Sequence, residues 1–193
     1  MCNTVTAVTD VMNELERSII GIGIDQGIAN CGFSVVKLYH DDRVVVLKSG
    51  IIKTASTITL PQRMTLLYSL LMELVKTYKP EIIGCEKLFF SPRQKVSSNG
   101  KKGRNKSASI VMTNMITGII NLIAGQKQVQ LQEFVPGTVK KYVTGSGRAD
   151  KDAVIAAVKH LLQRDNVKAD EADATAIGIT AVKFYRDTRA IAQ

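Results

Sequence analysis

The sequence predicts an α/β fold, with a mixed five-stranded sheet and helices on both faces. Three strand-like runs rich in Val and Ile come first, and amphipathic helices then alternate with single strands. The 193 residues, of which 45% are apolar and 22% charged, suit one compact domain with a sizeable core. We therefore expect a single domain over residues 19–187, preceded by an N-terminal extension (1–18) and followed by a C-terminal tail (188–193).

Short apolar runs that end in turn residues predict the five strands. The first run stops abruptly at residues 25–27 (Asp-Gln-Gly), which favour a turn. The second and third runs are separated by residues 40–42 (His-Asp-Asp), which predicts a β-meander. The predicted strands cover residues 19–24, 32–38, 43–52, 81–85 and 128–134.

Helices are predicted where apolar residues recur at three- and four-residue spacing. The first helix follows Pro61 and ends before Pro80, and Gly125 is placed to cap the second. Pro136 favours the first turn of a short helix, and Asp150 is a candidate cap for the next one. The predicted helices run through residues 64–78, 107–124, 136–142, 154–162 and 169–185.

The positive charge is concentrated in one segment. The chain has 26 Lys and Arg against 17 Asp and Glu, a formal charge of +9, and residues 88–106 are basic without any acidic residue. A solvated basic loop that only aids solubility is the simplest alternative. Because the segment is also rich in Ser and Gly and carries two aromatic residues, we expect it to bind nucleic acid. The expected contacts are Phe89, Phe90, Arg93, Lys95, Lys101, Lys102, Arg104 and Lys106.

Several protein classes are disfavoured by composition. No run approaches 18 apolar residues, and the first 16 residues include three acidic ones. A membrane protein or a secreted protein is therefore not expected, and we expect a cytoplasmic protein. Two histidines and three cysteines without a CxxC spacing favour reduced thiols and no structural zinc.

Four carboxylates stand at the ends of predicted elements. Asp25 and Glu86 each end an apolar strand, and Asp170 and Asp173 lie three apart at the start of a helix. Strand ends in open α/β sheets line ligand crevices, and a set of hard oxygen ligands is what Mg²⁺ or Mn²⁺ requires. The alternatives are a turn residue at Asp25, a salt bridge at Glu86, and favourable helix-dipole contacts for Asp170 and Asp173.

Four segments, in order and with suitable spacing, resemble the RuvC family of Holliday junction resolvases. They are residues 20–27, 85–90, 143–151 and 169–174, and the resemblance runs from about residue 19 to residue 182. It implies a ribonuclease-H-like fold, a homodimer, and Mg²⁺-dependent nicking of two strands of a four-way DNA junction in recombination and repair. It also leaves a branch-migration motor open as a further partner.

The resemblance assigns roles to individual residues. It makes Asp25, Glu86, Asp170 and Asp173 the catalytic and metal-binding carboxylates. Phe89 matches an aromatic residue that stacks on bases near the crossover. The basic residues expected near the cleaved strand and the active site are Lys140, Arg148 and Lys151.

The implied mechanism uses two Mg²⁺ ions per active site, for which Mn²⁺ would substitute, and leaves 5′-phosphate and 3′-hydroxyl ends. The chain departs from the family at Gln26, where Pro is common, and in its longer, more basic segment 91–106. Another ribonuclease-H-like nuclease, a transposase-like enzyme and a non-catalytic junction-binding protein remain alternatives. A non-catalytic junction-binding protein would lack one of the four carboxylates, and this sequence has all four.

Overall fold

The fold is built on a five-stranded sheet with strand order β3-β2-β1-β4-β5, seen in a computed structural model that describes residues 18–88 and 106–191. β1, β2 and β3 form an antiparallel meander, whereas β4 and β5 run parallel to β1. The predicted mixed sheet and meander are thus confirmed. The strands are β1 (Ile19–Asp25), β2 (Asn30–Leu38), β3 (Val44–Lys53), β4 (Ile82–Glu86) and β5 (Gln130–Phe134).

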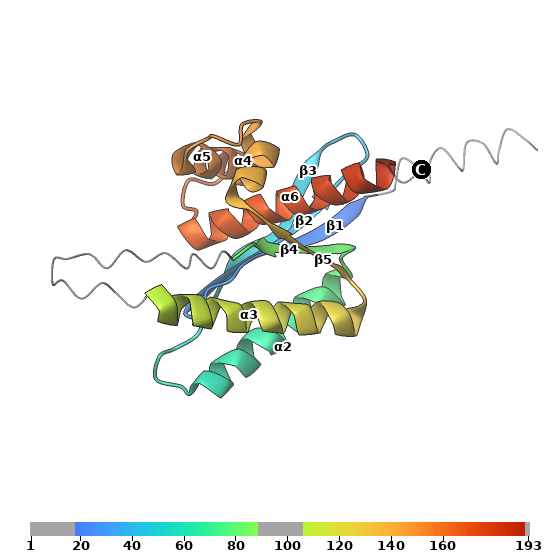
Figure 1. The fold of residues 1–193 in the computed structure, drawn as a ribbon. Coiled ribbons are helices and arrows are strands. Elements are labelled where there is room, and N and C mark those ends of the chain that lie inside the picture. Colours follow the sequence, from blue (N-terminus) through green and yellow to red (C-terminus); the bar gives the residue numbers. More distant parts are fainter. Residues whose placement is uncertain (1–17, 89–105, 192–193) are drawn as a thin grey trace, which may run out of the picture.

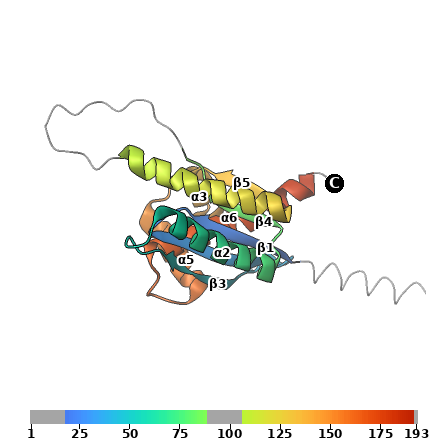
Figure 2. The same ribbon diagram turned by 90° about the horizontal axis from the view of Figure 1, so that it is seen from below.

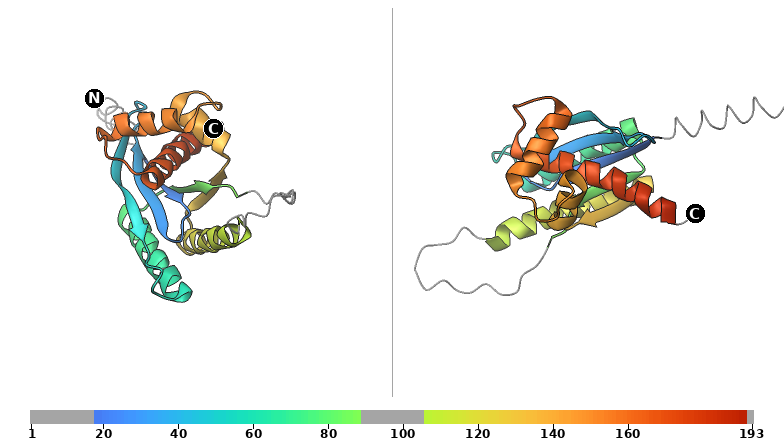
Figure 3. Two further views of the ribbon diagram at one scale, coloured as in Figure 1. Left: turned by 90° about the vertical axis from the view of Figure 1, so that its left-hand side faces the viewer. Right: turned by 90° about the horizontal axis from the view of Figure 1, so that it is seen from above.

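Helices cover both faces of this sheet, as predicted. Figures 1 and 3 show α2 and α3 on one side and α4, α5 and α6 on the other. Within the described residues, no helix has the combination of length and apolar character needed to cross a bilayer. The helices are α2 (Leu60–Tyr78), α3 (Lys106–Lys127), α4 (Pro136–Thr144), α5 (Lys151–Leu162) and α6 (Ala169–Ile191).

Strand alternation decides which side chains face α6. Ile24 and Cys85 belong to the main core with α2 and α3, whereas Gly84 lies against Ala181 of α6. Because successive side chains in a strand point to opposite faces, the next residues, Asp25 and Glu86, fall on the α6 side. Two strand-ending carboxylates therefore reach the same face of the sheet.

Two glycines allow the backbone of α6 to lie directly on the strands. A Cβ atom at Gly23 would stand 2.1 Å from the carbonyl oxygen of Ala174, and one at Gly32 would stand 2.0 Å from that of Asp170. Any side chain at either position would push the helix away from the sheet. This close approach brings the first turns of α6 next to the end of β1.

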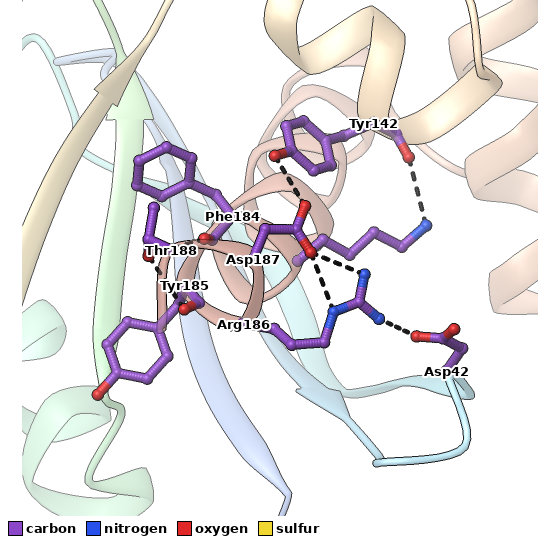
Figure 4. A network of polar contacts seen from close by, with 8 residues as sticks. Asp42, Tyr142, Phe184, Tyr185, Arg186, Asp187 and Thr188 are labelled. Atoms are coloured by element: carbon purple, nitrogen blue, oxygen red, sulfur yellow. Dashed lines mark hydrogen bonds and ion pairs between the residues drawn. The ribbon is translucent and has the colours of Figure 1, made fainter. Parts of the chain in front are cut away.

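A polar network holds the other end of α6 (Figure 4). The Tyr142 hydroxyl of α4 donates to Asp187 Oδ2 at 3.0 Å, and Arg186 donates to Asp187 Oδ1 and to Asp42 in the turn between β2 and β3. These contacts join α6 to α4 and to the meander. The predicted helix end near Tyr185 is therefore too early, because α6 continues to Ile191.

The predicted cap at Gly125 is wrong. α3 continues through this residue to Lys127, and the chain leaves the helix at Gln128, whose φ of 55° is left-handed. The Val129 amide then donates to the Ala124 carbonyl at 3.0 Å, which closes the last turn. As a result, β5 begins at Gln130 rather than at residue 128.

Candidate active site

A pocket of about 330 Å³ lies where β4, α4, α5 and α6 meet. Glu86 ends β4 at this pocket, and Asp173 reaches it from the second turn of α6. Lys140 of α4 and Lys151 of α5 add two positive charges to its lining, and apolar side chains such as Val139 complete the wall. Two of the four expected carboxylates, Glu86 and Asp173, thus line this pocket, whereas Asp25 is not among its lining residues and Asp170 lines a separate pocket beside Asn30.

Asp25 stands at the electrostatic centre of this region. The pKa of its carboxyl is raised from 3.8 to about 7, first by burial and then by the negative charges of Asp173, Asp170 and Glu86 in that order, while Lys151 opposes the shift. The other three predicted carboxylates are thus all close enough to act on Asp25. Because each of the other three disfavours ionisation of Asp25, the cluster favours a cation.

Glu86 is half-buried at the end of β4. Burial raises the pKa of its carboxyl above the ordinary value, the charge of Asp173 adds to the increase, and Lys151 lowers it. Lys151 is thus a base whose charge acts on Glu86, but burial and Asp173 outweigh it.

Lys151 is positioned by the cap of its own helix. Asp150 Oδ1 accepts a hydrogen bond from the Ala153 amide at 2.8 Å, which confirms the predicted cap and fixes Lys151 in the first turn of α5. Lys151 Nζ then donates to Asp173 Oδ2 at 2.9 Å, and this hydrogen bond raises the pKa of the ammonium group. The lysine side chain is 61% exposed, so the ion pair is held weakly and its nitrogen is accessible to a ligand.

A second ion pair anchors the start of α6, and the sequence analysis did not identify it. Glu171 is buried on the far side of the helix, where its Oε1 accepts from Ser49 at 2.6 Å and from Arg164 at 2.5 Å. Residues 170 and 173 share a helical face, whereas residue 171 is turned away from it. Glu171 thus fixes the rotation of α6 that directs Asp170 and Asp173 toward Asp25.

The donor set suits hard divalent cations. Asp25, Glu86, Asp170 and Asp173 supply only carboxylate oxygens, and Mg²⁺ or Mn²⁺ would relieve their repulsion. Across residues 18–88 and 106–191, however, no three carboxylate, imidazole or thiol groups already stand close enough to hold one ion. Holding one ion therefore requires these side chains to move closer together.

The other predicted DNA contacts fall into two groups. Lys140 is half-buried at the pocket, Arg148 is exposed in the turn between α4 and α5, and Lys106 begins α3. The remaining predicted contacts lie outside the described residues: Phe89, Phe90, Arg93, Lys95, Lys101, Lys102 and Arg104.

Comparison with known proteins identifies the family of this chain. The family model described as crossover junction endodeoxyribonuclease RuvC matches residues 20–181. The crossover junction endodeoxyribonuclease RuvC of Brachyspira hyodysenteriae is 32% identical, over 83% of this chain and 92% of that protein.

Solved structures show the same fold. Thermus thermophilus RuvC in complex with a Holliday junction substrate has a TM-score of 0.74 and 22% identity, and the match covers 88% of this chain and 96% of that one. The yeast mitochondrial Holliday junction resolvase has a TM-score of 0.57 and 16% identity, over 87% of this chain and 82% of that one. These likenesses confirm the predicted ribonuclease-H-like fold, and the chain belongs to the RuvC family of crossover junction endodeoxyribonucleases.

Proposed function

We propose that this protein is a Holliday junction resolvase, a structure-selective DNA endonuclease that makes paired symmetric nicks in four-way junctions. The observation that carries the proposal is that Glu86, Asp170 and Asp173 all act on the charge of Asp25, with Glu86, Asp173 and Lys151 lining one pocket, in a chain of the RuvC family. A non-catalytic junction-binding protein would have no need for a partly buried Asp25 with a pKa raised to about 7.

Four residues would hold two Mg²⁺ ions, for which Mn²⁺ would substitute: Asp25, Glu86, Asp170 and Asp173. When bound, such ions make the attacking water more acidic and stabilise the charge on the leaving 3′ oxygen. Asp25 is the candidate to be shared, because the other three carboxylates all act on it. Cleavage would leave 5′-phosphate and 3′-hydroxyl ends.

The chain's own cations would position the scissile phosphate. Lys151 Nζ is accessible and can exchange its bond to Asp173 for one to a phosphate oxygen. Lys140 lines the same pocket and adds a second positive charge. Both would stabilise the charge that develops on the phosphate during in-line attack.

The basic segment at residues 88–106 would track the phosphates of the junction arms, with Phe89 and Phe90 stacking on exposed bases. Arg148 would extend this surface beside the pocket. Replacing four basic residues of the segment by Gln should reduce the log–log salt slope of binding by about 0.9 for each duplex phosphate that the segment no longer neutralises. An unchanged slope would favour the solubility alternative. The four residues are Lys101, Lys102, Arg104 and Lys106.

Two nicks require two active sites, which a chain with one carboxylate cluster would supply as a symmetric dimer. The candidate interface is a face of α3, the long helix labelled in Figure 2. Val111 and Leu122 of this helix are 48% and 53% exposed, and their spacing of eleven residues places them on the same helical face. Ile119 and Ile123 of the same helix are instead buried within the monomer. A branch-migration motor as a further partner and a cytoplasmic location stay predictions.

The test is a comparison of substrates. Labelled four-way junction, linear duplex and RNA–DNA hybrid are incubated with the protein, with and without Mg²⁺, and the products are mapped. We expect Mg²⁺-dependent cuts at symmetric positions in the junction alone. Preferential cleavage of the hybrid would indicate another ribonuclease-H-like nuclease, and binding of the junction without cleavage would indicate a non-catalytic protein.

A further inference from the structure

Gln26, the residue after Asp25, has its side-chain amide buried between β4 and α3. The side chain is 4% exposed. Its Nε2 donates to the Glu86 carbonyl oxygen at 3.0 Å, and its Oε1 accepts from the Glu86 amide at 3.2 Å. The Gln26 side chain therefore binds both the main-chain carbonyl and the main-chain amide of Glu86, whose carboxylate is predicted to be catalytic.

This pairing continues the sheet beyond the point where β1 ends. β1 pairs with β4 up to Ile24 and Cys85, and then turns away, with the Gly27 amide donating to the Asp25 carbonyl at 2.9 Å. Glu86 therefore has no register partner in β1. A glutamine amide has the same donor and acceptor as a peptide group, so Gln26 takes the place of the missing backbone partner.

A third hydrogen bond fixes the orientation of the amide. Gln26 Nε2 also donates to Thr117 Oγ1 of α3 at 3.2 Å, and the Thr117 hydroxyl donates onward to the Thr113 carbonyl at 3.1 Å. Because that hydroxyl gives its only proton to Thr113, it can only accept from Gln26. Turning the amide over would place acceptor against acceptor, so α3 selects the orientation that holds Glu86.

We infer that Gln26 is a positioning residue, which sets the end of β4 so that the Glu86 carboxylate stays beside Asp25 where a metal ion would bind. The inference rests on the proposed function in that it takes Glu86 as a metal ligand. Without the Gln26 amide, the amide and the carbonyl of Glu86 each lose one hydrogen bond, and the end of the strand is held less firmly. Loss of a residue that orients a metal ligand through hydrogen bonds typically lowers metal affinity or activity about ten- to a hundredfold.

The test removes the hydrogen bonds while keeping the shape of the side chain. Gln26→Met is compared with Gln126→Met, because Gln126 is an exposed glutamine of α3 whose Oε1 accepts from the Tyr68 hydroxyl at 2.8 Å, away from the pocket. Binding of Mn²⁺ is titrated without DNA, and steady-state cleavage of the junction is measured in parallel. We expect Gln26→Met to bind Mn²⁺ about ten- to a hundredfold more weakly and to lose kcat at unchanged KM, whereas Gln126→Met matches the wild type.

Hydrogen exchange of the Glu86 amide tests the hydrogen bond in the wild-type protein, independently of how well Gln26→Met folds. We expect this amide to exchange far more slowly than that of Gly147 in the exposed turn after α4. Equal rates would overturn the inference. Wild-type Mn²⁺ affinity in a folded Gln26→Met would also overturn it, whereas absence of Mn²⁺ binding by the wild-type protein would refute the proposed function itself.

Discussion

Replacing Asp25 by Asn should stabilise the metal-free protein at alkaline pH, in addition to abolishing cleavage. Burial and three neighbouring carboxylates raise the pKa of Asp25 from 3.8 to about 7. Between these two values the folded protein holds a proton that the unfolded chain has released, so the free energy of unfolding falls as the pH rises. The fall is about 1.4 kcal/mol per pH unit and about 4 kcal/mol in all, complete above pH 7.

Asparagine has nearly the same shape and carries no charge, so it removes this pH dependence. The free energy of unfolding falls between pH 3.8 and about 7 because of Asp25, and two of these pH units lie between pH 5 and pH 7. We therefore expect the advantage of Asp25→Asn over the wild type to grow by about 2–3 kcal/mol between pH 5 and pH 8. For a chain of this size that is a difference in Tm of about 5–10 °C.

Urea unfolding in EDTA, at pH 5 and at pH 8, measures this change. Asp165→Asn is the control, because Asp165 is an exposed carboxylate in the turn before α6. Comparing the two pH values cancels any effect of the substitution on packing. If the gap between Asp25→Asn and the wild type stayed constant from pH 5 to pH 8, the electrostatic description of the pocket would be wrong.

Three further substitutions test other parts of the site. Gly23→Ala should destabilise the fold by about 1–3 kcal/mol in urea unfolding and lower cleavage, because the added Cβ would meet the α6 backbone. The control is Gly118→Ala, whose Cβ would point into open space and should not destabilise the fold. Changing Val111 and Leu122 together to Glu should give a monomer by light scattering, and an unchanged dimer mass would remove α3 from the interface. Lys151→Met should reduce kcat about a hundredfold or more while preserving junction binding, so a near wild-type kcat would exclude its role at the phosphate.

The sequence predicted those parts of the site that depend on local chemistry. Asp25 and Glu86 follow short apolar runs, and Asp150 precedes a helix in a capping position, so each could be placed from its neighbours in the chain. Asp170 and Asp173 share a helical face for the same local reason. These predictions needed only the periods of strands and helices.

The unpredicted parts depend on contacts between distant residues. Gln26 bonds to Glu86, 60 positions away, and nothing in its local sequence indicates that hydrogen bond. Gly23 lies in a short apolar run that predicts only a strand, yet it allows the close approach of α6. Gly125 was expected to end α3, but one glycine costs a helix only about 1 kcal/mol, and the buried Ile123 and Ala124 hold this turn in the core.

Cleavage of a supercoiled plasmid that extrudes a cruciform tests the central claim most directly, because it reports both the choice of substrate and the pairing of the nicks. With Mg²⁺, the wild-type protein should convert the plasmid to linear DNA with 5′-phosphate ends, and Asp25→Asn should bind the cruciform without cutting it. Nicked circles as the final product, or linear DNA formed equally well by Asp25→Asn, would contradict a paired carboxylate-dependent resolvase.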